Sequence, residues 1–116
     1  MSDAIANFLS AHLPIAGLAA YCVHLPNRLL DAQCFSKSLY PTSTEEMLSQ
    51  IVQGGRTLLP AKEQIIQYCW TFEGYRVYVA ARPEGVCLAL LVENNPSTQM
   101  VRIQETLQGF VDLTEL

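Results

Sequence analysis

The stretch Gln64–Asn95, QIIQYCWTFEGYRVYVAARPEGVCLALLVENN, decides the fold of this 116-residue chain. It contains three segments rich in Val, Tyr, Leu, Ile and Cys: Gln64–Phe72, Tyr75–Arg82 and Val86–Glu93. Such segments read as strands. Glu73-Gly74 separates the first pair and Pro83-Glu84-Gly85 separates the second, and both are plausible hairpin connections. The stretch therefore predicts a three-stranded antiparallel meander.

The last of these segments is apolar on both of its faces. One face carries Val86, Leu88, Leu90 and Val92, and the other carries Cys87, Ala89 and Leu91. A strand that is apolar on both faces needs a covering layer on each of them. Val86–Glu93 is therefore predicted to be central in its sheet.

The first segment differs, because its large side chains share one face. Four of them lie at alternate positions: Ile66, Tyr68, Trp70 and Phe72. A lateral strand with this aromatic load aggregates unless its edge is paired. Pairing with a second copy by strand addition removes the open edge, so the segment predicts a homodimer. Tyr68 and Trp70 are candidate dimer contacts of the hot-spot type, the alternative being that both fill the core under the middle helix.

Helices and two further strands flank the meander. We expect a helix over Asp3–His12, strands over Ile15–His24 and Leu29–Phe35, a middle helix that ends at Pro60, and a last helix capped by Ser97 or Thr98. The order helix-strand-strand-helix-strand-strand-strand-helix predicts a single α+β domain over residues 1–116.

The middle helix starts with two overlapping capping boxes. Thr42 precedes Glu45 by three positions, and Ser43 precedes Glu46 by three. Gly54-Gly55 follows in the middle of the helix, where it either kinks the helix or lets another backbone approach closely.

The composition excludes several classes of partner. The chain is 50% hydrophobic and 16% charged, and its formal net charge is −4. Nucleic-acid binding needs a basic surface, and the seven Lys and Arg residues are scattered. No apolar run is long enough to span a membrane, and no signal peptide is apparent, so we expect a soluble cytoplasmic protein. The apolar surplus predicts an interface.

No combination of residues predicts catalysis or a metal site. Cys22, Cys34, Cys69 and Cys87 lack the close spacing of zinc ligands, and we expect them to be reduced, buried thiols. The two histidines have no carboxylate or Cys at ligand spacing, and neither a nucleophile elbow nor a P-loop occurs. The sequence therefore predicts a protein that is not an enzyme and has no cofactor.

Two segments carry a resemblance to a known family. LPIAGLAAY at Leu13–Tyr21 and GVCLALLVENNP at Gly85–Pro96, followed by the last helix, resemble the roadblock/dynein light-chain family, a branch of the profilin-like folds. The resemblance implies a five-stranded antiparallel sheet, with the first and last helices on one face and the middle helix on the other. It also implies a homodimer or heterodimer formed through the middle helix and the third strand.

The function that the resemblance implies is that of a non-catalytic scaffold or regulator. Its partners would be a second copy, a sibling roadblock-type chain, a small Ras-like GTPase, or a motor or signalling complex. The candidate dimer contacts are Met47, Ile51, Val52, Ile66, Tyr68 and Trp70. Arg56 is a candidate contact with an acidic partner.

Two other functional classes compete with this interpretation. A type III secretion-like chaperone is also a small acidic α+β dimer, and it would bind an extended effector segment in an apolar groove. A small-ligand sensor would hold its ligand between sheet and helix, although the predicted core offers few convergent polar groups.

Overall fold

The computed structural model describes residues 3–58 and 67–113. Its elements follow one another in the expected order: α1 (Asp3–His12), β1 (Leu18–His24), β2 (Leu29–Cys34), α2 (Pro41–Leu58), β3 (Gln67–Phe72), β4 (Tyr75–Ala81), β5 (Cys87–Glu93) and α3 (Met100–Asp112). The expected residues 64–66 of the third strand and Pro60 at the end of the middle helix lie outside the described residues.

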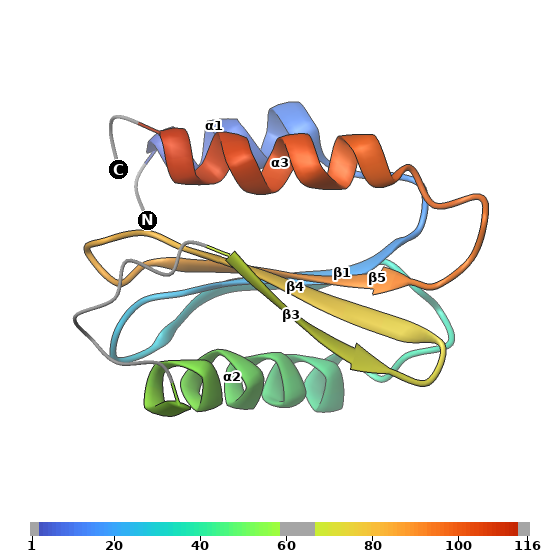
Figure 1. Cartoon of the computed structure of the whole chain (residues 1–116), viewed down its shortest axis with the longest axis horizontal. Helices are drawn as coiled ribbons and strands as arrows, with labels where there is room; N and C mark the ends of the chain where they lie inside the picture. Colours follow the sequence, from blue (N-terminus) through green and yellow to red (C-terminus); the bar gives the residue numbers. More distant parts are fainter. Residues whose placement is uncertain (1–2, 59–66, 114–116) are drawn as a thin grey trace.

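The strands form one antiparallel sheet in the order β2-β1-β5-β4-β3. Figure 1 shows α1 and α3 on one face of the sheet and α2 on the other. This arrangement confirms the α+β fold and the layers that the resemblance implies. It also confirms that the segment Val86–Glu93 forms a central strand and that β3 is lateral.

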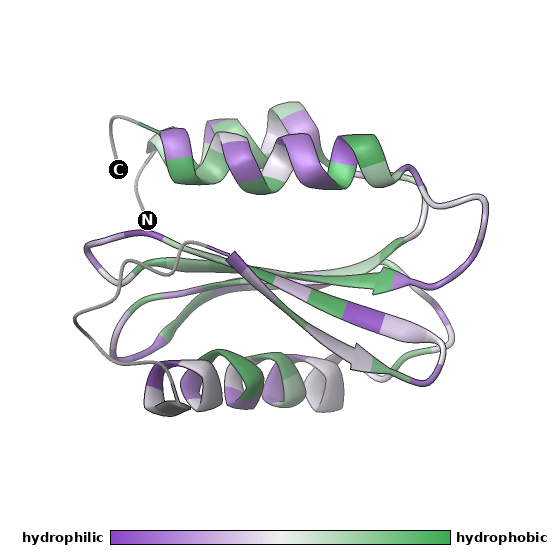
Figure 2. Ribbon diagram, in the orientation of Figure 1, coloured by the Kyte–Doolittle hydropathy of each residue, from purple (hydrophilic) through white to green (hydrophobic). Residues whose placement is uncertain are grey.

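The sheet separates two apolar clusters, and β5 contributes to both. Val86, Leu88, Leu90 and Val92 pack under α1 and α3, in a cluster that also contains Ile5, Phe8, Ile103, Leu107 and Phe110. Cys87, Ala89 and Leu91 pack on the other side with Leu48, Ile51 and Val52 of α2. In Figure 2, β5 is apolar along almost its whole length, whereas β3 is mixed. The alternation along β5 therefore assigns its side chains to the two layers as expected.

Both hairpin connections of the meander end in a glycine with positive φ. Gly74 between β3 and β4 has φ +79°, and Gly85 between β4 and β5 has φ +96°. Residues with a side chain rarely adopt this backbone conformation, so these turns require glycine. The two predicted connections are confirmed.

The starts of α2, α3 and β1 differ from the predictions. The amide of Thr44 donates to the carbonyl of Tyr40 (2.9 Å), so α2 begins at Pro41 and both predicted capping residues lie within its first turn. The N-cap of α3 is Gln99, whereas Thr98 donates to the carbonyl of Glu93 (2.8 Å). Residues 15–17 form a turn closed by a bond from Leu18 N to Ile15 O (3.0 Å), which delays the start of β1.

Candidate protein-interaction surface

The outer edge of β3 is the open side of the meander. Within residues 67–113, β3 pairs with β4 on one side only. The described residues thus leave the backbone groups on its other side to a partner strand. Tyr68 and Trp70 are half-buried and pack against the cluster beneath α2, whereas Phe72 at the end of the strand is 41% exposed. The strand thus combines an open edge with large apolar side chains.

An apolar groove of about 320 Å³ lies next to this edge. One wall comes from the β2–α2 connection and the first turns of α2, and the other comes from β3, β4 and β5. Its large lining side chains are Leu39, Tyr40, Met47, Phe72, Tyr75 and Leu91. The described residues that line the groove include no charged side chain. Such a lining is suited to another apolar surface and offers no means of holding a charged ligand.

The most exposed large apolar side chains identify the same region. Among the described residues these are Tyr40 (81% exposed), Val101 (72%) and Phe72 (41%). Tyr40 and Phe72 both line the groove, whereas Val101 lies on α3 across the sheet. The groove therefore joins two of the three exposed side chains of this kind into one surface, which we call the β3 surface: the β3 edge together with the groove.

Gly55 allows α2 to approach β3. A Cβ atom placed on Gly55 would overlap the hydroxyl end of Tyr68, whereas one on Gly54 would meet nothing within 4 Å. Burial raises the pKa of Tyr68 to about 12, so this hydroxyl stays protonated at neutral pH. The helix continues through both glycines. The close approach at Gly55 thus involves a side chain of β3, where we expected a backbone.

The predicted dimer contacts differ in how deeply their side chains are buried. Met47 is half-buried and lines the groove, and its contact with a partner stays a prediction. Ile51 is buried and Val52 is 0% exposed, so both face the chain's own core, and Val52 has no surface left for a second chain. Ile66 lies outside the described residues. Sequence reasoning missed Tyr40, although an aromatic residue directly before Pro41 belongs to no apolar stripe and was a visible signal.

Arg56, the candidate partner contact, is engaged within its own chain. Its guanidinium donates from Nη2 to Gly85 O (2.6 Å) and from Nη1 to Leu25 O (3.0 Å) and Pro26 O (3.2 Å). Nη2 also lies 3.5 Å from Cys87 Sγ. The last turn of α2 is thereby tied to the β1–β2 turn and to the β4–β5 turn. Contact of Arg56 with a partner stays a prediction.

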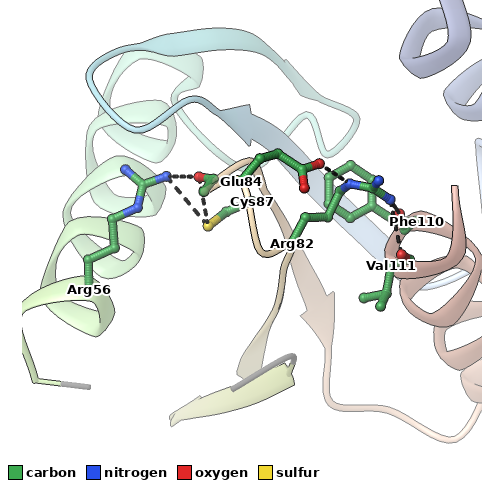
Figure 3. A network of polar contacts seen from close by, with 7 residues as sticks. Arg56, Arg82, Glu84, Cys87, Phe110 and Val111 are labelled. Atoms are coloured by element: carbon green, nitrogen blue, oxygen red, sulfur yellow. Dashed lines mark hydrogen bonds and ion pairs between the residues drawn. The ribbon is translucent and has the colours of Figure 1, made fainter. Parts of the chain in front are cut away.

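A second arginine, Arg82, belongs to the β4–β5 turn and reaches α3 in the opposite layer. Figure 3 shows Arg56 and Arg82 on either side of this turn. Arg82 Nη1 donates to Phe110 O (2.7 Å) and Val111 O (3.0 Å), two carbonyls in the last turn of α3, and Arg82 also pairs with Glu84. A cation at this position complements the helix dipole and satisfies carbonyls that have no partner within the helix. The turn therefore connects both helical layers.

The thiols and other polar groups do not assemble into a metal site in the described part of the chain. No three His, Cys, Asp or Glu side chains there could hold a metal ion together. Cys22 and Cys87 are buried and Cys34 is half-buried, but Cys69 is exposed, so the expectation of a buried thiol was wrong for Cys69. Cys69 points away from the α2 cluster because it alternates with Tyr68 and Trp70 along β3. None of the helices in the described ranges is long and apolar enough to cross a membrane.

The comparisons with known proteins bear on the fold. The structure is similar to that of Myxococcus xanthus MglB, with a TM-score of 0.51 and 11% sequence identity over 90% of this chain and 86% of that chain. No family model matches the sequence. No curated protein matches it at a significant level. At this identity the similarity shows a shared fold, which agrees with the fold that the roadblock resemblance of the sequence implies.

Proposed function

We propose that this protein is a non-catalytic dimeric scaffold that regulates a small Ras-like GTPase. The observation that carries the proposal is the β3 surface, where an open strand edge adjoins an uncharged apolar groove. Within the described residues no group of His, Cys, Asp or Glu side chains that could hold a metal ion competes with this surface as the functional site.

Dimer formation through the β3 surface follows from two physical requirements. The β3 edge needs a strand partner, and a second copy of β3 provides one while extending the two sheets into a single sheet. The exposed side chains of Tyr40 and Phe72 would be buried by a second copy. The groove that they line has no charged described residue, and the centres of dimer interfaces are likewise depleted of charge. A stable dimer buries about 800 Å² on each copy, so we expect the interface to include the exposed face of α2 as well as the edge and the groove.

The GTPase part of the proposal rests on the roadblock-type fold. The resemblance implies a platform for a Ras-like GTPase, and the dimer would present one continuous sheet with α2 of each copy on the same face. The partner contacts would then lie on surfaces that exist only in the dimer. A sibling roadblock-type chain in place of the second copy would serve the same purpose.

The dimer is tested by sedimentation velocity on the purified protein. We expect the wild type to sediment as a dimer and the double variant Tyr40→Ser, Phe72→Ser to dissociate, with a dissociation constant raised about tenfold for each lost aromatic contact. Serine is also a favourable N-cap, so α2 is retained in the variant. The control is Val101→Ser, the same kind of change on α3, which should leave the dimer intact. A wild-type protein that stays monomeric at high concentration would contradict the proposal.

The GTPase partner is tested by affinity capture from the protein's own cell extract. Wild type and the double variant are each used as bait, in the presence of GDP or a non-hydrolysable GTP analogue. We expect the wild type to retain a Ras-like GTPase in a nucleotide-dependent manner and the dissociated variant to lose it. Equal recovery of the same GTPase by both baits would show that dimerisation is not required.

The type III secretion-like chaperone is the second candidate, because a groove beside an open strand edge also suits an extended peptide. Capture of an unstructured effector segment that competes with the second copy, without any GTPase, would favour it.

A further inference from the structure

A second groove lies at the opposite edge of the sheet and on its other face. It has a volume of about 450 Å³ and runs between α1 and the strands β1 and β2. Leu9, Leu13 and Phe35 are its large apolar lining residues. Tyr21 of β1 and Asp31 of β2 line it from the sheet. In contrast to the groove beside β3, this one contains a charged side chain.

The described residues provide no counter-ion for the charge in this groove. Asp31 accepts a hydrogen bond at Oδ2 from the hydroxyl of Tyr21 (2.8 Å). The groove lining contains no Lys, Arg or His, and among residues 3–58 and 67–113 the ion pairs do not include Asp31. A cation that enters this groove could therefore pair with the carboxylate of Asp31 without displacing another cation of the described residues.

Tyr21 donates its hydroxyl proton to this carboxylate. Burial, followed by the hydrogen bond to Asp31, raises the pKa of Tyr21 well above its ordinary value, so the phenol remains a donor at all physiological pH values. The hydroxyl of Tyr21 donates to Oδ2, one of the two carboxylate oxygens of Asp31. The other oxygen, Oδ1, receives no hydrogen bond from the described residues and is left for a ligand.

The groove also adjoins an open strand edge. β2 pairs with β1 on one side, and the described residues place no strand on its other side. Asp31 and Gln33 stand opposite Val23 and Tyr21 of β1, so both side chains lie on the α1 face beside that edge. A polypeptide added along β2 would place every second side chain over this groove.

We propose that this groove binds an arginine side chain of a partner polypeptide that lies extended along the open edge of β2. The guanidinium would donate to Asp31, and its plane would lie against the ring of Phe35, which is 5.9 Å from the ring of Tyr21 between centroids. The methylenes of the arginine would pack on Leu9 and Leu13. Lysine satisfies the charge but lacks the planar face, so arginine fits the groove better.

The proposal concerns the edge opposite to β3, so it is independent of the proposed dimer. Sedimentation reports on the β3 edge, whereas peptide binding reports on the β2 edge, so the two proposals can fail separately. The Tyr21–Asp31 bond also connects β1 to β2, and the test therefore changes the ligand as well as the protein.

The test is an NMR titration of the full chain with three probes. The first is an acetylated, amidated pentapeptide of sequence Thr-Val-Arg-Val-Thr, the second is the same peptide with neutral citrulline in place of arginine, and the third is agmatine. The amide signals of Tyr21, Asp31 and Gln33 report on binding. We expect the arginine peptide to bind about tenfold more tightly than either other probe.

The variant Asp31→Asn should reduce the affinity for the arginine peptide to that for the citrulline peptide. Glu46→Gln, which removes an exposed carboxylate on α2 across the sheet, should bind the arginine peptide as the wild type does. Equal binding of the arginine and citrulline peptides to the wild type would overturn the proposal, even if Asp31→Asn does not fold. Agmatine binding as tightly as the peptide would overturn the polypeptide partner and assign the groove to a small organic cation.

Discussion

β5 and β3 have similar strand-forming sequences but opposite surroundings. β5 has a neighbouring strand on each side and a helical layer on each face, and its side chains from Cys87 to Val92 are all buried. Among the described residues β3 has one neighbouring strand, and only Tyr68 and Trp70 are half-buried against the α2 cluster, whereas the other four side chains of the strand are exposed. The comparison shows that the position in the sheet decides whether apolar side chains stabilise the chain itself or remain available to a partner.

The largest expected effect is at the centre of β5. Leu90 is fully buried in the cluster under α1 and α3, and Leu90→Ala leaves a cavity between the sheet and those helices. We expect the free energy of unfolding to fall by about 3 kcal/mol, within the range of buried Leu→Ala changes. Urea denaturation measures it. Phe72→Ser on β3 is the matched change at the edge, and a loss as large as that of Leu90→Ala would contradict the distinction between the two strands.

The next effect concerns Arg56, which fixes the start of β5 to α2. The guanidinium of Arg56 donates to carbonyls of two turns, from two different nitrogens. In Arg56→Lys a single ammonium group replaces it and can reach fewer of these carbonyls. We expect a loss of about 2 kcal/mol in the free energy of unfolding, because carbonyls in both turns lose a charged donor. The midpoint of urea denaturation measures this loss. Arg28→Lys at an exposed position in the β1–β2 turn is the control and should change little. Equal stability of the two variants would show that the carbonyl contacts of Arg56 are dispensable.

A pH effect should also originate beside β5. His24 of β1 stands opposite Cys87. Burial lowers the pKa of His24, and the positive charge of Arg56 lowers it further. The hydrogen bond to the Leu25 carbonyl raises the pKa, but by less. The unfolded chain therefore binds a proton at a higher pH than the folded chain does. As far as His24 decides it, the free energy of unfolding has its full value above about pH 6.5, the ordinary pKa of histidine. It decreases as the pH falls below that value, by at most about 1.4 kcal/mol per pH unit.

Urea denaturation of wild type and His24→Gln between pH 7 and pH 5 measures this effect. The variant should show a flatter dependence of stability on pH in this range. Parallel profiles for the two proteins would mean that His24 has the same pKa in the folded and unfolded states.

The smallest effect separates two adjacent glycines. Gly54→Ala should stabilise α2 by up to about 1 kcal/mol, since the added methyl group meets no neighbour. Gly55→Ala gains the same helix propensity but displaces the Tyr68 ring, so its stability should fall below that of Gly54→Ala and its dimer should be weaker. Thermal unfolding and sedimentation velocity on both variants measure the difference. Identical behaviour would show that Tyr68 adjusts without moving β3.

The sheet was predictable because its signals are local. The alternation along Val86–Glu93 and the glycines at positions 74 and 85 fixed the meander, and the aromatic residues of β3 indicated a lateral strand. The helix starts were less predictable, because Thr42 and Ser43 both match a capping box, whereas the first helical bond runs from the amide of Thr44 to the carbonyl of Tyr40.

The surface features depended on contacts between distant segments. Arg56 binds carbonyls about 30 positions away on either side, and no local pattern in the sequence indicates such partners. The groove of Asp31 requires the register of β1 on β2, which places Tyr21 diagonally across from it. Tyr40 could be recognised as a loop aromatic, but its exposure depended on how the groove is built.

The most direct test of the account is amide hydrogen exchange measured on dilute and concentrated samples of the wild type. If two copies meet through the β3 surface, the outward amides of Gln67–Phe72 should exchange more slowly in the concentrated sample, whereas those of Cys87–Glu93 should be equally protected in both samples. Exchange in β3 that does not depend on concentration, in a protein that stays monomeric throughout, would contradict the account.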